Sequence, residues 1–447
     1  MPKKSFKYID LFAGIGGFAA ALEAFGGEHV YSVEIDKQAA KVYEQNWRRS
    51  PLGDITLDAN EERVIVGEHD ILAAGFPCQP FSKSGAQRGM DETRGTLYFN
   101  ILQIIEKHHP TVVLLENVRN LAGPRHVHEM KIIVKTLREA GYWVSDEPSI
   151  FSPHLLPREM GGRPQIRERV FITATYDPKN VGGIQTPEPV AMPKPVSGWN
   201  PQKWNLDRDL PLDHKSVVPG CELSEGEKLW INAWDDWVQM YYELSEGKNP
   251  PGFPIWADDW VEISDLKLKT DTPAWKANFQ IKNADLYTRH KKDFDAWALK
   301  WGVFSDAFPP SRRKLEWQAQ DTPALWDCVM HFRPSGIRAK KPTYLPALVA
   351  ITQTSIIGPW KRRLSPREAA RLQGLPDGFS FDGQKDSATY KQLGNGVNVG
   401  VVWNILKWHV ARDESILKTT AQGRRILDAV SGSPASPDEL LEKMFTH

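Results

Sequence analysis

The N-terminal part of the chain alternates between short apolar runs and a segment with helical spacing. The runs lie at 7–12, 29–35, 70–76 and 111–117, and residues 19–25 have apolar positions at helical spacing. The run at 111–117 is almost wholly apolar, which is typical of a strand buried on both faces of a parallel sheet. The pattern predicts an α/β fold with a Rossmann-like, mostly parallel sheet, which would bind its ligand beyond the carboxyl ends of the strands.

Between about Asp177 and Trp326 this pattern disappears, and prolines and tryptophans become frequent. Trp230, Trp234 and Trp237 fall at helical spacing, which favours packing in a core over a surface for stacking bases. We therefore expect a separate, smaller domain in the middle of the chain.

Composition sets the outer bounds of the interpretation. The 447 residues allow two or three domains, and 41% of them are hydrophobic, which is enough for a sizeable core. No window approaches the roughly 18 apolar residues of a spanning helix, and the N-terminus lacks the apolar core of a signal peptide. The 3 cysteines lie far apart, which excludes a disulfide framework or a CxxC metal site. We expect reduced thiols, no bound metal and a cytoplasmic protein.

The formal net charge is zero, which argues against a protein that coats nucleic acid without specificity. A zero sum can nevertheless hide a local basic face, and basic residues do cluster. The clusters are Arg163, Arg167 and Arg169; Arg312, Arg313 and Lys314; Arg333, Arg338, Lys340 and Lys341; and Lys361, Arg362, Arg363, Arg367 and Arg371.

A glycine-rich turn follows the first apolar run. Gly14, Gly16 and Gly17 allow the backbone to approach a ligand, and Glu34 follows the loop by about 20 residues, where an acid holds ribose hydroxyls in such folds. This pairing predicts a nucleoside-bearing cofactor, with Asp54 as a candidate partner of an adenine amino group. The glycines lie closer together than in GxGxxG, which disfavours a nicotinamide dehydrogenase. The alternative is a tight turn that only packs helix on strand.

A cysteine stands in an unusual place after the run at 70–76. Cys78 follows Pro77 in GFPCQPFS, where an exposed turn would present its thiolate as a nucleophile. Glu116 closes another predicted strand, and we expect it to share a crevice with Cys78. Burial would raise the pKa of such a carboxyl and let it act as an acid, although it could also cap the following helix.

Six motifs stand in a particular order along the chain, and together they cover about 7–175 and 360–410. They are DLFAGIGGF, GFPCQPFS, ENV, QIRERVF, RLSPREAARLQGLPDGF and QLGNGVNV. With them the chain resembles the DNA cytosine-5 methyltransferases, which use S-adenosylmethionine on a class I methyltransferase fold. The uncovered middle is where that family carries its variable target recognition domain.

The resemblance implies a set of catalytic residues. Cys78 would attack C6 of cytosine, Glu116 would protonate or hydrogen-bond ring N3, and Arg167 and Arg169 of the QxRxR motif would help to hold the base, with Gln165 at its first position. Attack on C6 raises the electron density at C5 so that C5 can take the methyl group.

The resemblance also implies cofactor contacts and DNA contacts. The residues that match the S-adenosylmethionine pocket are Phe12, Gly14, Gly16, Glu34, Asp54, Pro77, Leu97 and Asn395; the family more often has serine at the position of Gly396. The segment from Ser82 to Gly95 would be a mobile loop that closes over double-stranded DNA once the base is flipped out. Its candidate contacts are Ser82, Ser84, Gln87 and Arg88, and those of the middle domain are Arg333 and Arg338, which would read bases or contact phosphates.

The expected domain organisation follows from the same resemblance. Residues 1–180 would form the first part of the catalytic and cofactor-binding domain, and residues 181–350 the target recognition domain. Residues 351–412 would be the hinge and the return that completes the catalytic domain, and 413–447 a C-terminal extension.

The leading hypothesis is a sequence-specific DNA cytosine-5 methyltransferase, the modification enzyme of a restriction system with a cognate endonuclease as its partner. The rival is a tRNA cytosine-5 methyltransferase on the same fold, since the chemistry does not distinguish DNA from RNA; the long middle segment favours DNA. A catalytically silent DNA-binding module would be expected to lack Cys78 or Glu116. The target sequence is not readable from the chain.

Overall fold

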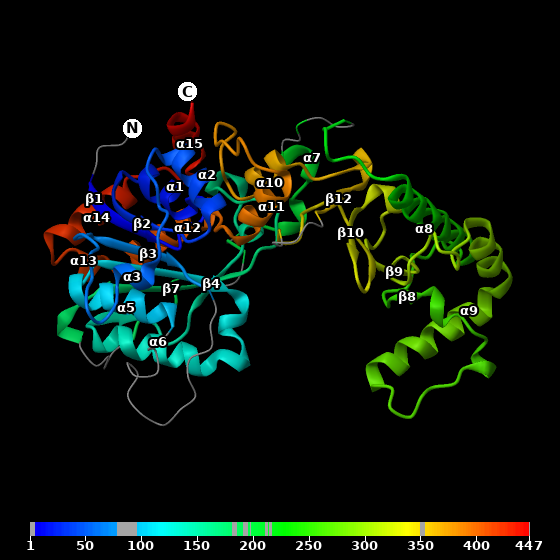
Figure 1. Ribbon diagram of the computed structural model, residues 1–447. Helices are drawn as coiled ribbons and strands as arrows, with labels where there is room; N and C mark the ends of the chain where they lie inside the picture. Colours follow the sequence, from blue (N-terminus) through cyan, green and yellow to red (C-terminus); the bar gives the residue numbers. More distant parts are fainter. Residues whose placement is uncertain are drawn as a thin grey trace. The chain divides into compact units, whose positions relative to one another are not determined.

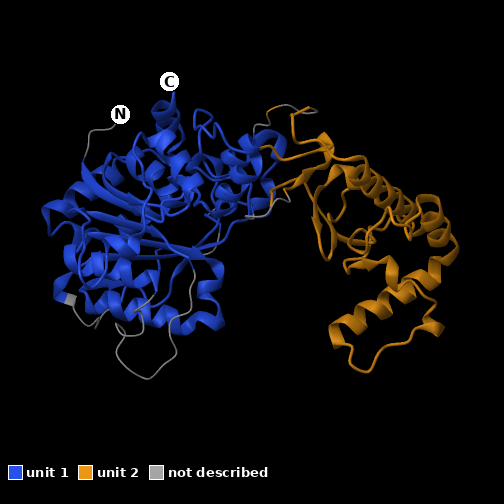
Figure 2. Ribbon diagram, viewed as in Figure 1, with its two compact units in different colours: residues 1–210, 346–352, 366–447 blue, residues 211–345, 353–365 orange. Residues whose placement is uncertain are grey.

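The computed structural model describes residues 5–77, 96–180, 186–190, 195–196, 198–210, 213, 217–348 and 354–446. The chain forms two compact units (Figure 2): unit 1 comprises 1–210, 346–352 and 366–447, and unit 2 comprises 211–345 and 353–365. Unit 1 is therefore assembled from three separate stretches of sequence. Among the described helices, none is long and apolar enough to cross a membrane.

Unit 1 is built on one mixed sheet (Figure 1), whose strands run in the order β2-β1-β3-β4-β7-β5, with β6 also paired to β7. The strands are β1 Phe6–Leu11, β2 Gly27–Val33, β3 Ile71–Gly75, β4 Val112–Val118, β5 Tyr142–Val144, β6 Ser149–Phe151 and β7 Arg169–Tyr176. The first four strands are parallel, as their apolar runs predicted. Strands β1, β3 and β4 are buried along nearly their whole length, whereas the middle of β2 is half-buried. The fold class expected from the sequence is confirmed.

Strand β4 marks the change from parallel to antiparallel pairing. It pairs in parallel with β3 but antiparallel with β7, and β5 and β6 pair antiparallel with β7 as well. Glu116 and Asn117 therefore lie within β4, where the sequence suggested the end of the strand. The extra pairing with β7 extends the ladder past these residues, because β7 runs the full length of β4.

Helices cover both faces of this sheet (Figure 1). Helices α3, α5 and α6 bury their apolar sides against one face, in a core that includes Leu11, Leu72, Val113, Ile101 and Ile133. Helices α1, α12 and α14 pack together on the other face. The helices of unit 1 are α1 Gly17–Ala24, α2 Lys37–Trp47, α3 Ile55–Asp58, α5 Leu97–His108, α6 Val127–Glu139, α7 Leu206–Asp209, α10 Pro366–Leu372, α11 Asp386–Asn395, α12 Val399–Arg412, α13 Glu414–Leu417, α14 Ala421–Ser431 and α15 Asp438–Phe445.

The C-terminal segments are integral to unit 1. Helix α12 packs on α1, and α15 places Phe445 edge-on against Trp47 of α2, with ring centroids 5.2 Å apart. Burying an aromatic ring of this kind contributes about 1.5–3 kcal/mol. The last helices thus hold together the elements that carry the glycine loop.

Unit 2 combines a second sheet with two long helices, α8 Glu225–Leu244 and α9 Ala274–Trp301. The strand order is β13-β12-β10-β11-β9-β8. The strands are β8 Ile255–Trp256, β9 Lys314–Gln318, β10 Val329–Arg333, β11 Gly336–Lys340, β12 Ile356–Ile357 and β13 Arg362–Arg363. Trp234 and Trp237 are fully buried, as expected, while Trp230 is only half-buried at the edge of the same core.

Candidate active site

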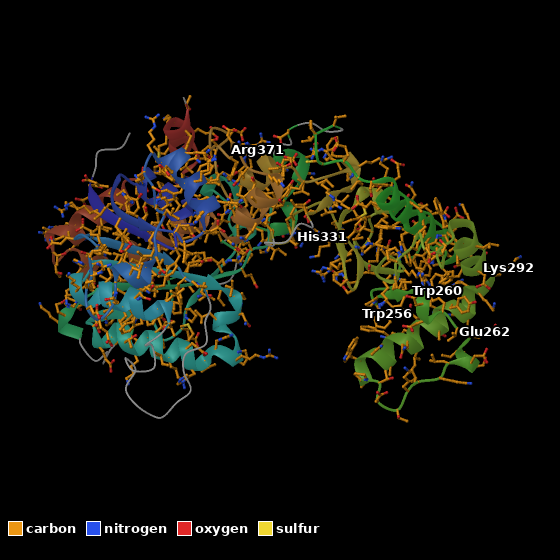
Figure 3. All side chains as sticks on the ribbon, in the orientation of Figure 1. Trp256, Trp260, Glu262, Lys292, His331 and Arg371 are labelled. Atoms are coloured by element: carbon orange, nitrogen blue, oxygen red, sulfur yellow. The ribbon has the colours of Figure 1, made fainter. Side chains whose placement is uncertain are left out.

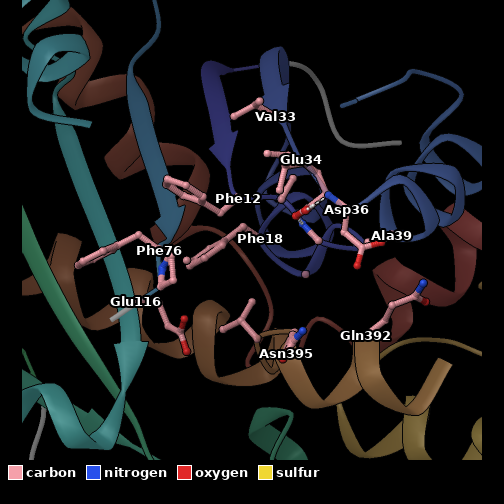
Figure 4. A pocket seen from close by; sticks show the side chains of 18 of the residues that line it. Phe12, Phe18, Val33, Glu34, Asp36, Ala39, Phe76, Glu116, Gln392 and Asn395 are labelled. Carbon is pink, nitrogen blue, oxygen red and sulfur yellow. Dashed lines mark hydrogen bonds between the residues drawn. The ribbon is translucent and has the colours of Figure 1, made fainter. Parts of the chain in front are cut away.

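A cavity of about 470 Å³ opens at the carboxyl ends of β1, β2, β3 and β4 (Figure 4). Its size lies within the usual range for small-molecule sites. Helix α11 and the residues after it complete the wall, so the cavity joins the first 120 residues to the C-terminal return. Among the residues predicted to bind a cofactor, those that line it are Phe12, Gly14, Glu34, Asp54, Pro77, Leu97 and Asn395.

Glu34 fixes the glycine loop at this cavity. One carboxylate oxygen, Oε2, accepts a hydrogen bond of 2.8 Å from the backbone N–H of Gly14, and Oε1 accepts one of 2.7 Å from the N–H of Asp36. Phe12 and Gly14 both have positive φ, of 57° and 55°. A left-handed backbone conformation is uncommon for phenylalanine. This turn directs the ring of Phe12 toward the cavity (Figure 4).

Gly16 differs from the other loop residues predicted to touch the cofactor. It does not line the cavity but precedes helix α1 with a φ of 94°, and a Cβ here would lie 2.1 Å from the indole Nε1 of Trp47. Its neighbour Gly17 does line the cavity, and a Cβ there would meet Val397 at 2.7 Å. In this structure Gly16 therefore serves close packing, and Gly17 forms the wall.

Two isoleucines that the sequence interpretation missed flank the far end of the cavity. Ile35 follows Glu34 and is 70% exposed, and Ile55 follows Asp54. Asp54 caps α3, because its Oδ1 accepts from the N–H and the hydroxyl of Thr56 at 2.9 and 2.7 Å. The signal that could have identified Ile35 is a large apolar residue directly after Glu34, beyond the end of the buried strand, where it does not pack in the core.

Asn117 anchors the segment that leads to the predicted nucleophile. Its buried side-chain amide donates a hydrogen bond of 2.8 Å to the carbonyl oxygen of Phe76. Phe76 and Pro77 both line the cavity. Cys78 is the next residue in the chain and lies outside the described residues, as do Ser82, Ser84, Gln87 and Arg88.

Glu116 and Arg169 form an ion pair in the cavity wall, with 3.0 Å between Oε1 and Nε. Antiparallel pairing places Arg169 opposite Val118, so the two side chains are diagonal neighbours on one face of the sheet. Glu116 is only 8% exposed. Burial raises the pKa of its carboxyl above the ordinary value, and the positive charges of Arg169 and Arg167 reduce this increase.

Arg167 is buried beside the cavity, and its positive charge acts on the Glu116 carboxyl. Its guanidinium is buried, does not line the cavity, and donates to the carbonyl oxygens of Leu348 (3.3 Å), Gly394 (2.8 Å) and Gly396. These contacts hold the backbone on both sides of Asn395, so Arg167 supports the wall of the cavity.

Gln165 is also fully buried, and neither its Oε1 nor its Nε2 has a hydrogen-bond partner among the described residues. It does not line the cavity. An unpaired buried amide is costly, so a water molecule or a group outside the described residues is expected to complete its hydrogen bonds.

Helix α11 brings further polar groups to the cavity. Lys391 and Gln392 line it together with Asn395, and the ammonium of Lys391 contacts a carboxylate oxygen of Asp36 at 3.1 Å. This ion pair connects residues that are 355 positions apart in the sequence. Both partners are well exposed, so the contact contributes little to stability.

The remaining predicted substrate contacts, Arg333 and Arg338, belong to the sheet of unit 2 and not to this cavity. Within the described residues no group of histidine, cysteine and acidic side chains could hold a metal ion. The cavity thus combines a glycine loop, an acid placed for ribose hydroxyls, apolar walls and a buried carboxyl–guanidinium pair. These groups suit the binding of a nucleoside next to a carboxyl group that can donate a proton.

Comparisons with known proteins agree with this geometry. The profile of the family described as C-5 cytosine-specific DNA methylase matches residues 6–411. The Type II methyltransferase M.AluI of Cellulosimicrobium cellulans is 50% identical, over 96% of this chain and 97% of the relative. M.HpaII of Haemophilus parainfluenzae is 42% identical over 90% and 88%, and M.BanI of Aneurinibacillus aneurinilyticus is 29% identical over 90% and 95%. The chain therefore belongs to the C-5 cytosine-specific DNA methylase family and is a DNA (cytosine-5-)-methyltransferase.

Proposed function

We propose that this chain transfers the methyl group of S-adenosylmethionine to C5 of a cytosine that is flipped out of duplex DNA. The observation that carries the proposal is the Glu116–Arg169 pair in the wall of the nucleoside-sized cavity. The register of β3 and β4 aligns Glu116 with Gly75, which precedes Cys78 by three residues in the sequence. The covalent step and base flipping are part of the proposal.

Cys78 and Glu116 have different roles in the proposed reaction. When bound, S-adenosylmethionine supplies an electrophilic methyl group. The Cys78 thiolate forms a bond from Sγ to C6, and Glu116, whose raised pKa favours a retained proton, donates to ring N3 as charge develops. After C5 takes the methyl group, the C5 proton passes to solvent and the electrons of the C5–H bond form the C5–C6 double bond. The Sγ–C6 bond breaks with its electrons going to sulfur, which releases the Cys78 thiolate, and the N3 proton returns to Glu116.

The residues around the cavity support cofactor binding in the same way. Glu34 is placed to accept from ribose hydroxyls, and Ile35 and Ile55 offer apolar surfaces for an adenine ring. Asn395 presents an amide whose backbone is fixed by Arg167. Asp54 retains Oδ2 for an exocyclic amino group, since its helix cap uses Oδ1.

The names of the relatives support a more specific role. M.AluI and M.HpaII are called Type II methyltransferases. We infer that this enzyme acts as the modification partner of a restriction endonuclease that recognises the same site in double-stranded DNA.

The test uses labelled S-adenosylmethionine with duplex DNA or with tRNA, followed by mapping of the modified cytosines. We expect label in DNA at one short sequence, and resistance of that DNA to an endonuclease that cuts there. Label confined to tRNA would overturn the proposal. Cys78→Ala should abolish transfer and leave S-adenosylmethionine binding unchanged, whereas substantial residual turnover would contradict the covalent mechanism.

A further inference from the structure

The sheet of unit 2 has one apolar face and one strongly basic face. Alternate residues Met330, Phe332, Ile337 and Leu315 point into the core against α8 and α9. The opposite face carries Lys314, Glu316 and Gln318 on β9, His331 and Arg333 on β10, and Arg338 and Lys340 on β11. Figure 3 shows these side chains, with His331 and, on the neighbouring strand β8, Trp256 labelled.

The strand register arranges this face in rows. Glu316, Arg338 and His331 lie side by side across three strands. In the next row Gly336 separates Lys314 from Arg333. Gly336 has a φ of 141°, and a Cβ there would lie 2.9 Å from the Cβ of Lys314, so glycine is required for this close approach.

Positive charge dominates the face. Glu316 is the only acidic side chain among its strand residues, against the cations of Lys314, Arg333, Arg338 and Lys340. No side-chain ion pair of Arg333 or Lys340 is found within the part of the chain that the structure describes. Clustered like charges repel each other, and a polyanion such as nucleic acid relieves that repulsion.

Glu316 forms an ion pair with the Nε edge of the Arg338 side chain, without a hydrogen bond to Nε among the described residues. Its Oε2 lies 3.3 Å from Nε of Arg338, and its Oε1 accepts a hydrogen bond of 3.0 Å from the hydroxyl of Ser335. Ser335 lies in the turn between β10 and β11. Both carboxylate oxygens of Glu316 therefore contact residues of this hairpin. No hydrogen bond from the terminal nitrogens of Arg338 is found among the described residues, and the side chain is 25% exposed.

His331 supports the same arrangement. Its Nε2 is 2.8 Å from the hydroxyl of Ser355, and its cross-strand neighbour is Arg338. Burial lowers the pKa of His331 to about 3, and the charges of Arg333, Lys340, Arg338 and Arg363 act in the same direction. The ring is therefore neutral near pH 7 and adds no further charge beside Arg338.

We propose that Arg338, oriented by Glu316, reads the edge of a guanine in the target sequence, and that Arg333, Lys340 and Lys314 hold the phosphate backbone. This inference rests on the proposed function and assigns the residues that determine its specificity. The terminal nitrogens of Arg338 have no hydrogen-bond partner among the described residues, and its Nε side faces the Glu316 carboxylate. Such a guanidinium matches the O6 and N7 acceptors of guanine in the major groove.

The position of Glu316 is the reason for assigning Arg338 to a base. A carboxylate on a surface that binds only phosphates would weaken binding, because it repels them. A carboxylate that orients an arginine improves discrimination, since the fork is held in place before the base arrives. Arg333, which lacks such a partner among the described residues, fits a phosphate contact.

The experiment methylates mixed genomic DNA in vitro and maps every modified cytosine by sequencing after bisulfite treatment. The target need not be known, because the consensus emerges from the map. We expect Arg338→Ala to lose the preference for guanine at one position of the consensus by about ten- to hundredfold. Arg338→Lys should not restore it, because lysine lacks the planar fork, and Glu316→Gln should relax the same position in part.

Two control variants separate base reading from general effects. Lys340→Ala should reduce methylation at all sites with an unchanged consensus and should lower the salt dependence of DNA binding by about one ion. Arg289→Ala removes an exposed arginine of α9 that is paired with Asp285, outside the sheet, and should change neither property.

An unchanged consensus for folded Arg338→Ala would overturn the inference, and so would an unchanged consensus for Glu316→Gln. If Arg338→Ala does not fold, the consensus of Arg338→Lys and Glu316→Gln decides. A wild-type protein that methylates no DNA refutes the proposed function instead, so the two failures are distinguishable.

Discussion

Replacement of Arg167 by lysine tests whether a buried arginine outside the cavity controls cofactor binding. The guanidinium donates to three backbone carbonyl oxygens, those of Leu348, Gly394 and Gly396, and two of these flank Asn395. Lysine keeps the positive charge but has one compact ammonium on a shorter reach. We expect it to retain about one of these contacts.

The magnitude follows from the lost hydrogen bonds. A hydrogen bond from a charged donor contributes about 1.5–3 kcal/mol, so the loss of two lowers the free energy of unfolding by about 3–6 kcal/mol. For a large domain this corresponds to a fall in Tm of about 6–12 °C. If the released loop around Asn395 adopts its binding geometry only a tenth of the time, the Kd for S-adenosylmethionine rises about tenfold.

The assay pairs thermal unfolding with calorimetric titration of S-adenosylmethionine, and Arg163→Lys is the matched control. Arg163 is also partly buried and donates to the carbonyl oxygens of Arg371 and Gly162 and to the carboxylate of Asp438. None of these partners lines the cavity. Arg163→Lys should lose stability without losing cofactor affinity. Equal cofactor affinities for the two variants would refute the reasoning.

Two further predictions concern the loop and the catalytic acid. Gly16→Ala should destabilise unit 1 by several kcal/mol, because its Cβ would lie 2.1 Å from Trp47 Nε1, whereas Gly14→Ala, with no atom within 4 Å of its Cβ, should cost only about 1 kcal/mol; similar melting temperatures would contradict this. Glu116→Gln should lower kcat about 10²–10³-fold with unchanged cofactor affinity. In the wild type the raised pKa of Glu116 keeps its carboxyl protonated to higher pH, so activity that depends on this proton falls as pH rises through that pKa. The stability contributed by the protonated Glu116 is complete below about pH 4 and is lost as pH rises through the same pKa. In Glu116→Gln neither the activity nor the stability should fall over this pH range. A pH dependence that the wild type and the variant share would exclude Glu116 as its source.

The elements that the sequence predicted best are those in which local pattern and tertiary role coincide. The apolar runs that became β1, β3 and β4 are buried on both faces, so their composition alone identifies them. The glycine loop was recognisable from Gly14, Gly16 and Gly17, and two of these glycines, Gly14 and Gly16, do have positive φ. Glu34 followed from its distance to that loop.

Other features depend on contacts that no local pattern contains. The side chain of Arg167 is directed by carbonyl groups at 348, 394 and 396, more than 180 residues away in the sequence. The motif QxRxR indicates two arginines but not that Arg169 lines the cavity while Arg167 bonds to backbone carbonyl groups beside it. The role of Gly16 likewise depends on Trp47, which arrives from α2.

The pairing of Glu116 with Arg169 shows how the mixed sheet produces the chemistry. If β7 ran parallel to β4, as the apolar runs of the other strands suggest, the residue that begins β7 would lie at the opposite end from Glu116. Because β7 is antiparallel, its first residue Arg169 lies opposite Val118, at the carboxyl end of β4, and meets Glu116 diagonally. On the other side of β4, Gly75 is aligned with Glu116, and a Cβ there would lie 3.4 Å from Oε2. The carboxyl therefore lies between a strand that leaves space for it and a strand that supplies its cation, and this change of strand direction at β4 places an acid with a raised pKa at the mouth of the cavity.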